Sequence, residues 1–213
     1  HVPDWARSLS QSQALDAYMD YQQAVIEHLK DDPIIESWQL ENEFWLRSFG
    51  EKPFDFSRRR LKREFQQIRQ LNPERPIIMS LGSVVSLPLG SPTPDIYATS
   101  IYRNIYNNKQ SQYPHTKIQP YVYKIKRELI LWLKRRDLII HELQTEPWGP
   151  QANWEMSPAE QDRSMSVDDI KSAIEYANAT NIKYVDLWGA EWWYWRNEKR
   201  INQAVNQAVE SKS

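Results

Sequence analysis

Apolar residues recur every three or four positions in five stretches of the chain, a spacing that predicts helices with one buried face. The stretches cover residues 10–32, 54–74, 119–137 and 166–180 and a tail from about Asn197. Serines able to cap the helix open the first stretch and Pro33 ends it, while Ser166 and Asp169 stand at capping-box spacing in the fourth. The basic residues of the second stretch are expected to form a solvated helix face.

In the first three stretches the apolar positions define the stripe that is expected to face the core. These positions are Leu15, Tyr18, Tyr21, Val25 and Leu29 in the first, Leu61, Phe65, Ile68 and Leu71 in the second, and Tyr121, Ile125, Leu129, Trp132 and Leu133 in the third. Each helix is therefore expected to cover one side of a sheet.

Short apolar runs lie between the predicted helices and indicate strands, some of them buried on both sides. They cover residues 34–40, 76–81, 95–102, 138–143 and 182–189. Residues 82–94 carry enough proline and glycine to predict a loop where a helix would be expected, and a second long polar loop is predicted before Ser166.

Helices and strands alternate along the chain, which is typical of βαβ units and a parallel sheet. No glycine-rich phosphate turn follows a strand, so a nucleotide-binding doubly wound fold has little support. The pattern predicts a (β/α)8 barrel, in which reactive residues collect at the C-terminal ends of the strands. Since about five strands are predicted rather than eight, residues 1–213 are expected to form a single domain that supplies part of a barrel.

The composition narrows the classes of partner. A net charge of −1 and a pI near 6.5 give no long-range field for nucleic acid or an anionic membrane. No apolar run approaches the roughly 18 residues that span a bilayer, the chain has no cysteine, and His28 and His115 lack metal-ligand spacing. We therefore expect a neutral partner and no metal, cofactor, membrane or nucleic acid. The ten tryptophans suit stacking on sugar rings, and the localisation stays open.

Polar groups follow the predicted strands in turn. They are Glu41, Asn42 and Glu43, then Ser80 to Ser83, then Tyr102 and Arg103, then Glu142, then Trp188 and Glu191. Two carboxylic acids at the ends of different strands suit cleavage of a glycosidic bond, which needs an acid for the leaving oxygen and a second carboxylate.

At these residues the chain resembles the retaining glycoside hydrolases of clan A, and most nearly family 42, the β-galactosidase-like enzymes. The segment "WQLENEF" at 38–44 is similar to that family's Trp-Gln-x-Asp-Asn-Glu-aromatic signature after the fourth strand, with Glu41 where Asp is usual. The resemblance implies that Glu43 is the general acid/base and that Asn42 binds the sugar 2-hydroxyl. Trp38, Phe44 and Trp45 are expected to form an apolar wall that raises the pKa of Glu43 by desolvation.

The segment "HELQTEPWGPQANW" at 141–154 is similar to the family's nucleophile segment and implies Glu142 as the nucleophile. Tyr102 matches the clan's tyrosine that positions the nucleophile, and Trp188 matches its sugar platform. The resemblance covers strands four to eight, so strands one to three and the basic residue of the second strand have no counterpart here. The residues expected to contact the sugar are Asn42, Tyr102, Arg103, Glu146, Trp148, Trp188 and Glu191.

Alternatives remain open for several of these residues. Glu146 competes with Glu142 as nucleophile, although Glu142 ends the apolar run directly, and Glu41 competes with Glu43 as acid/base. Tyr102 could equally be a buried structural tyrosine. About half of the tryptophans near the site, Trp148, Trp154, Trp192, Trp193 and Trp195, should be packing residues. His141 is expected to point away from Glu142, toward the helix layer.

The sequence thus predicts a retaining glycosidase that cleaves a β-glycosidic bond by double displacement, with a carbohydrate as substrate. The alternative is a catalytically weak or inactive carbohydrate-binding barrel fragment. In either case the missing strands predict a complementing N-terminal segment or a homo-oligomer as a partner.

Overall fold

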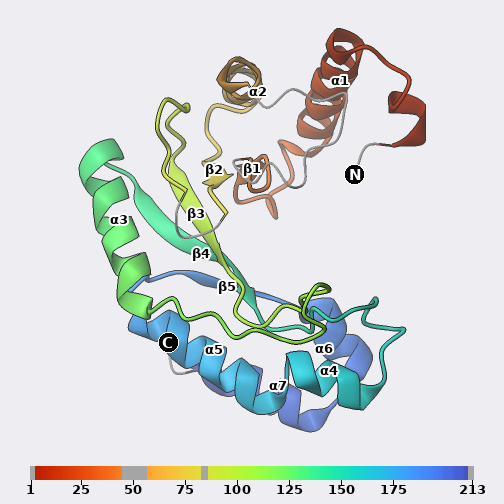
Figure 1. The fold of residues 1–213 in the computed structure, drawn as a ribbon. Helices are drawn as coiled ribbons and strands as arrows, with labels where there is room; N and C mark the ends of the chain where they lie inside the picture. Colours follow the sequence, from red (N-terminus) through yellow and green to blue (C-terminus); the bar gives the residue numbers. More distant parts are fainter. Residues whose placement is uncertain (1–2, 45–56, 83–85, 211–213) are drawn as a thin grey trace. The chain divides into compact units, whose positions relative to one another are not determined.

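The structure is a computed structural model that describes residues 3–44, 57–82 and 86–210 (Figure 1). The chain divides into two compact units, residues 1–98 with 130–137 and residues 99–129 with 138–213. The first unit contains η1 (Asp4–Ala6), α1 (Gln11–Leu29), β1 (Trp38–Leu40), α2 (Arg58–Leu71) and β2 (Ile77–Ser80). The second contains α4 (Pro158–Ser164), α5 (Val167–Ala179), β5 (Val185–Trp188), α6 (Ala190–Arg196) and α7 (Lys199–Glu210). Residues of β3 (Ile96–Ile101), α3 (Pro120–Lys134) and β4 (Asp137–Gln144) belong to both units.

The strands follow the chain order, β1-β2-β3-β4-β5, in one five-stranded sheet. The pairs β1–β2, β2–β3 and β4–β5 are parallel: Trp38 stands opposite Ile77, Ile78 opposite Ile96, and Gln144 opposite Trp188. Parallel strands joined by helices form part of a (β/α)8 barrel, so the predicted fold class is confirmed. The expectation of a single domain stays a prediction.

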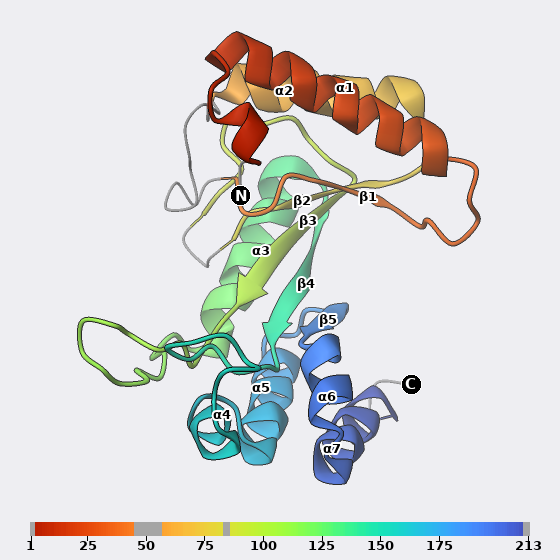
Figure 2. The same ribbon diagram turned by 90° about the vertical axis from the view of Figure 1, so that its right-hand side faces the viewer.

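The core of the first unit forms around β2, all four residues of which are buried, as expected of a strand covered on both sides. In this unit α1 and α2 lie side by side (Figures 1 and 2), and α2 buries Leu61 and Ile68 of its predicted stripe. The stripe predicted for α1 is wrong at Tyr21, which is 67% exposed, whereas its other four members are part-buried beside the buried Ala14 and Ile26.

Charged residues also enter this core. Arg60 of α2 is 4% exposed and pairs with Glu41 at 3.0 Å and with the fully buried Glu64 at 3.4 Å. The prediction of a purely solvated basic face on α2 is therefore wrong at Arg60. A buried arginine is tolerated here because two carboxylates compensate its charge.

In the second unit, α5 and α7 lie side by side, and α5 buries Ile170, Ala173 and Ala177 (Figures 1 and 2). The capping box predicted at the start of α5 is confirmed, since Ser166 and Asp169 bond reciprocally.

The stripe predicted for α3 is wrong. Tyr121, Ile125 and Trp132 are 53% to 69% exposed, whereas Tyr123, Lys126 and Ile130 are buried. Apolar residues occur on more than one face of this helix, so periodicity alone could not select the buried one. The helix turns Lys126 inward because its ammonium group donates to Thr99 at 3.0 Å.

Two short helices were not predicted. Ser157 caps α4, which has Pro158 in its first turn, inside the stretch taken as a long polar loop. Gly189 precedes α6, whose sequence is the aromatic cluster "AEWWYWR". Tertiary contacts of these aromatic residues, rather than helical propensity, hold α6 in place.

Candidate active site

The turn after β1 places Glu43, the predicted acid/base, in a strained backbone. Glu41 and Glu43 have φ angles of +54° and +49°, in the left-handed region that glutamate seldom adopts. Glu43 is 8% exposed and Phe44 2%. Strain of this kind persists only where surrounding contacts stabilise it, and it is common in functional sites.

Gly82, just beyond β2, provides the space for the Glu43 side chain. A Cβ at this glycine would lie 3.3 Å from Glu43 Oε1 and 3.4 Å from Glu43 Cβ, and the residue itself has a φ of +67°. The β1–β2 pairing, in which Leu40 stands opposite Met79, holds the two strand ends together. A larger residue at position 82 would therefore crowd the carboxylate. Ser83, expected at the same rim, lies outside the described residues.

The other polar residues of this turn have structural partners. Glu41 is bound to Arg60, and the Asn42 side-chain oxygen accepts a hydrogen bond from Gln39 at 3.1 Å. The Trp38 indole donates to Asn72 at 3.0 Å. The ion pair engages the Glu41 carboxylate, and the choice between Glu41 and Glu43 as acid/base stays a prediction. Of the predicted apolar wall, Trp45 lies outside the described residues.

A β-bulge in β4 determines how Glu142 is presented. Ile140 stands opposite Val185 and Leu143 opposite Leu187, so β4 takes three steps where β5 takes two. His141 and Glu142 therefore both face the position of Asp186. The bulge breaks the alternation on which the prediction for His141 rested, so the side of the sheet that His141 faces stays a prediction. His141 Nδ1 pairs with the exposed Asp186 at 2.6 Å, and this hydrogen bond raises the pKa of His141.

Glu142, the predicted nucleophile, is 6% exposed and accepts a hydrogen bond from the Tyr102 hydroxyl at 2.8 Å. Gln144 fixes the segment that carries this tyrosine, because its side-chain oxygen accepts from the backbone N–H groups of Arg103 at 2.8 Å and Asn104 at 2.9 Å. The sequence analysis did not single out Gln144. Its position two residues beyond Glu142, on a strand end, is the signal that could have found it.

Arg103, expected at the sugar, is held by α5 instead. Its guanidinium donates to the Ser172 carbonyl at 3.2 Å and lies 4.3 Å from the centre of the Tyr176 ring. A second terminal nitrogen lies 2.6 Å from His115. Burial lowers the pKa of Arg103. These contacts hold Arg103 between the segment after β3 and α5, and its contact with the sugar stays a prediction.

Glu146 is the centre of an aromatic cluster. Its Oε1 accepts hydrogen bonds from the indoles of Trp188 at 2.9 Å and Trp148 at 3.2 Å, and its Oε2 lies 3.4 Å from the Asn153 amide nitrogen. Burial raises the pKa of Glu146, and the nearby charge of Glu191 adds to this. The cluster is continuous with the Glu142 pair, because the Tyr102 ring meets Trp148 edge-on at 5.0 Å.

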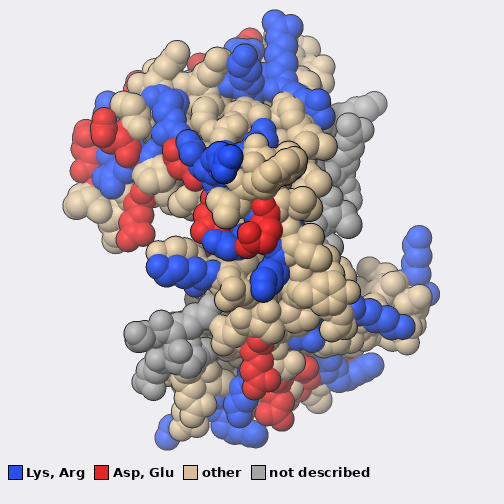
Figure 3. Space-filling model, turned by 90° about the vertical axis from the view of Figure 1, so that its left-hand side faces the viewer, with Lys and Arg blue, Asp and Glu red and all other residues tan. Residues whose placement is uncertain are grey.

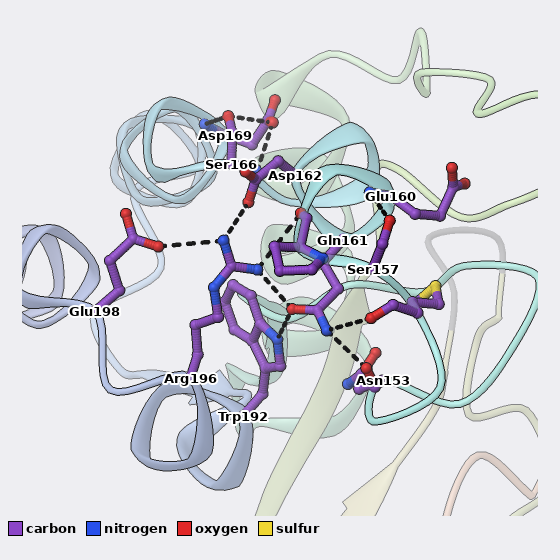
Figure 4. Close-up of polar contacts among 12 residues, drawn as sticks. Asn153, Ser157, Glu160, Gln161, Asp162, Ser166, Asp169, Trp192, Arg196 and Glu198 are labelled. Carbon is purple, nitrogen blue, oxygen red and sulfur yellow. Dashed lines mark hydrogen bonds and ion pairs between the residues drawn. The ribbon is translucent and has the colours of Figure 1, made fainter.

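A buried amide anchors the loop that carries this cluster (Figure 4). Gln161 of α4 donates to the carbonyls of Asn153 and Met156, at 2.7 and 3.2 Å, and accepts from Trp192 and Arg196 of α6, at 3.0 and 2.7 Å. Gln161 is fully buried, and both its amide oxygen and its amide nitrogen are hydrogen-bonded. This network connects α6 to the turn that presents Asn153 to Glu146.

The remaining tryptophans near the site divide into buried and exposed groups. Trp192 is buried against Gln161, and Trp193 donates to the Thr145 carbonyl at 2.8 Å, so both are packing residues. Trp154 and Trp195 are 74% and 54% exposed. Glu191 is exposed in the first turn of α6.

The described residues show neither a one-sided charge on the face drawn in Figure 3 nor a metal-binding cluster. Basic and acidic side chains are interspersed on the face drawn in Figure 3, and neither sign dominates it. Within residues 3–44, 57–82 and 86–210, no group of three or more His, Asp or Glu side chains could hold a metal ion. In the same ranges no helix combines the length and apolarity needed to span a bilayer.

Solved structures resemble this fold at low sequence identity. A GH2 β-galacturonidase from Eisenbergiella tayi bound to galacturonate matches with a TM-score of 0.61 and 14% identity over 93% of this chain and 37% of its own. GH5_18 from Streptomyces cattleya in complex with GlcNAc matches with a TM-score of 0.61 and 15% identity over 99% of this chain and 58% of its own. Xylanase 10B from Thermotoga petrophila in complex with xylobiose matches with a TM-score of 0.57 and 12% identity over 99% of this chain and 71% of its own. No family model and no curated protein sequence matches the chain.

These likenesses show that the chain has a (β/α)8 fold, which is also the fold of the glycoside hydrolases that it resembles. At 12% to 15% identity they show the fold alone. The chain spans well under two thirds of the first two structures. Since the neighbours belong to families 2, 5 and 10, the finer resemblance to family 42 remains a prediction.

Proposed function

We propose that the protein is a retaining glycoside hydrolase that cleaves a β-glycosidic bond, with Glu142 as nucleophile and Glu43 as acid/base. The observation that carries the proposal is the hydrogen bond from the Tyr102 hydroxyl to the buried Glu142 carboxylate. A carboxylate nucleophile must be ionised and held in one orientation, and a phenol that donates to it supports both requirements. Glu146 lacks such a bond and is tied to two indoles, which favours Glu142 over Glu146.

In the proposed first step, a Glu142 oxygen attacks the anomeric carbon while Glu43 gives its proton to the leaving glycosidic oxygen. In the second, Glu43 takes a proton from water, the water oxygen attacks the anomeric carbon, and Glu142 leaves as a carboxylate. Retention requires the two carboxyl groups to stand about 5–5.5 Å apart. Glu43 belongs to the first unit and Glu142 to the second, so their meeting at the barrel mouth is part of the proposal.

The second candidate is a carbohydrate-binding barrel fragment that is weak or inactive alone and needs a complementing N-terminal segment or a second copy. Partial coverage of the neighbouring structures favours it. The residues of β5 are also intermediate or exposed throughout, whereas the strands of a closed barrel are covered on both faces. The two candidates differ in turnover, because a binder that lacks a complete site releases the sugar unchanged.

The test uses aryl β-glycosides and the full chain. We expect Glu142→Gln and Glu43→Gln each to lower kcat/KM by at least about 10³-fold, because each removes a group that takes part in bond making or breaking. Glu155→Gln, an exposed acid of the 147–157 segment, is the control and should retain activity. Proton NMR of the first-formed anomer should show the β configuration.

The outcomes separate the candidates. Turnover that survives Glu142→Gln would reject the assigned nucleophile, and an α product would reject the double displacement. A chain that binds sugars, hydrolyses none of a broad panel, and gains turnover only with an added N-terminal barrel segment would establish the second candidate instead.

A further inference from the structure

Glu146 has no part in the two-carboxylate reaction, yet two tryptophans direct their only polar group at one of its oxygens. Trp148 follows β4 along the chain and Trp188 ends β5, so the indoles arrive from different segments. The carboxylate is the one feature that both share. Its position therefore determines how the two rings stand relative to one another.

The engaged N–H groups decide what the rings can offer to a ligand. An indole has one donor and no acceptor, and Glu146 takes that donor from both rings. Trp148 is nevertheless 37% exposed and Trp188 46%. The accessible parts of both rings are then their C–H edges and π faces, which suit the apolar face of a pyranose ring rather than a hydrogen-bonding ligand.

The contacts to Glu146 come from three uncharged donors, Trp148, Trp188 and Asn153. A half-buried carboxylate held by neutral donors gains less than an ion pair would provide, and Glu191 of α6 repels it. A neutral residue at this position would avoid both costs. The Glu146 carboxylate does, however, orient the two indoles, because one of its oxygens accepts hydrogen bonds from both.

We propose that Glu146 is a positioning residue that fixes Trp148 and Trp188 as two aromatic walls for a neutral pyranose ring and disfavours a uronic acid. The inference rests on the proposed function for its substrate. Glu146 and the nearby Glu191 together place negative charge beside the two indoles, so a sugar carboxylate is repelled. The GH2 neighbour bound to galacturonate accepts such a sugar, which makes the contrast testable.

The first experiment needs no sugar. The ten tryptophans give ten indole N–H signals in a proton–nitrogen correlation spectrum, and Trp148→Phe and Trp188→Phe identify two of them. We expect these two signals to move together in a pH titration, with one shared midpoint above the ordinary glutamate value. Glu146→Gln, which keeps an oxygen acceptor and the side-chain shape, should abolish the shared movement. Glu155→Gln should leave it unchanged, and Glu191→Gln should lower the midpoint without uncoupling the signals.

The second experiment measures binding in the Glu142→Gln background, where turnover does not interfere. We expect Glu146→Leu to weaken binding of a neutral methyl β-glycoside about tenfold, because the indoles lose their shared acceptor. Glu146→Gln should restore most of this affinity. It should also improve binding of the corresponding β-glucuronide about threefold or more at low salt, because one repelling charge is removed.

Two results would overturn the inference. One is a pair of indole signals that titrate independently of each other or still move in Glu146→Gln. The other is an affinity for the β-glucuronide that Glu146→Gln leaves unchanged. A failure of the proposed function looks different. In that case Glu142→Gln leaves turnover intact, or no turnover exists, while the two indole signals still report Glu146.

Discussion

Replacing Tyr102 by phenylalanine removes the single hydroxyl on which the assignment of the nucleophile depends. The donated bond is 2.8 Å long and its acceptor, Glu142, is 6% exposed, so water has little access to replace it. The phenylalanine ring keeps the edge-on contact with Trp148 that the tyrosine ring makes at 5.0 Å. The change thus removes a hydrogen bond to a carboxylate and keeps the ring.

The magnitude follows from the charge of the acceptor. A hydrogen bond to a charged group contributes about 1.5–3 kcal/mol, which corresponds to about 10- to 150-fold in rate. Since the bond orients the nucleophile rather than the substrate, we expect the loss to appear in kcat with KM changed by less than about threefold. The melting temperature should fall by about 3–12 °C, because about 1 kcal/mol shifts it by roughly 2–4 °C in a chain of this size.

The assay is steady-state hydrolysis of an aryl β-glycoside by wild type, Tyr102→Phe and a matched control. Tyr113→Phe is that control, because the Tyr113 hydroxyl also donates to a carboxylate, Glu160, at 2.6 Å. It should keep the wild-type kcat. If Tyr102→Phe retains kcat within about twofold, or if Tyr113→Phe loses as much, the hydroxyl does not orient the nucleophile and the reasoning is refuted.

Four further predictions concern other parts of the site. Gly82→Ala should lower both kcat and the melting temperature, because its Cβ approaches Glu43 Oε1 to 3.3 Å at a φ of +67°; a variant with unchanged kcat would contradict this. Glu43→Gly should abolish turnover yet raise the free energy of unfolding by about 1 kcal/mol, because backbone strain is relieved; a lower free energy of unfolding would show that the contacts of Glu43 outweigh the strain. Because the pKa of His141 is raised in the folded state, protonated His141 stabilises the fold at pH values below the His141 pKa of the unfolded state. This contribution is lost as the pH rises through the His141 pKa of the folded state. Asp186→Asn should therefore destabilise the protein at about pH 5.5 but not at about pH 9, and a pH-independent loss would be inconsistent with the pair. Gln161→Leu should raise KM and broaden the Trp192 indole signal, whereas Gln151→Leu, an exposed control in the same loop, should not.

The order of helices and strands could be predicted because each element carries its own periodicity. The strands at 77–80 and 96–101 were found as apolar runs, and the α5 cap from its serine and aspartate. The buried face of α3 could not be predicted, since Lys126 enters the core only because Thr99 lies opposite. Arg60 is a similar case, because Glu41 and Glu64, which compensate its charge, come from different elements.

The candidate site was predictable as residue types at strand ends, but its contacts were not. Nothing local in the sequence indicates that Gln144 binds the backbone at residues 103 and 104, or that Trp188 reaches Glu146. The bulge that turns His141 toward Asp186 also depends on the pairing of β4 with β5. These are long-range contacts, and they determine which of two neighbouring acids faces the tyrosine.

The departures from ordinary local structure occur at one kind of position. Left-handed glutamates follow β1, a bulge precedes the end of β4, and a half-buried carboxylate with uncharged partners lies just beyond it. The N-terminal end of β3 shows ordinary local structure. Asp95, which directly precedes this strand, accepts a hydrogen bond from the Ile77 N–H and pairs with the Arg69 guanidinium. These bonds outweigh burial and lower the pKa of Asp95. Strain and desolvation thus occur at the C-terminal ends of β1 and β4, whereas an ordinary ion pair occurs at the N-terminal end of β3. The proposed function predicts this difference, since the C-terminal ends of (β/α)8 strands carry the reactive residues.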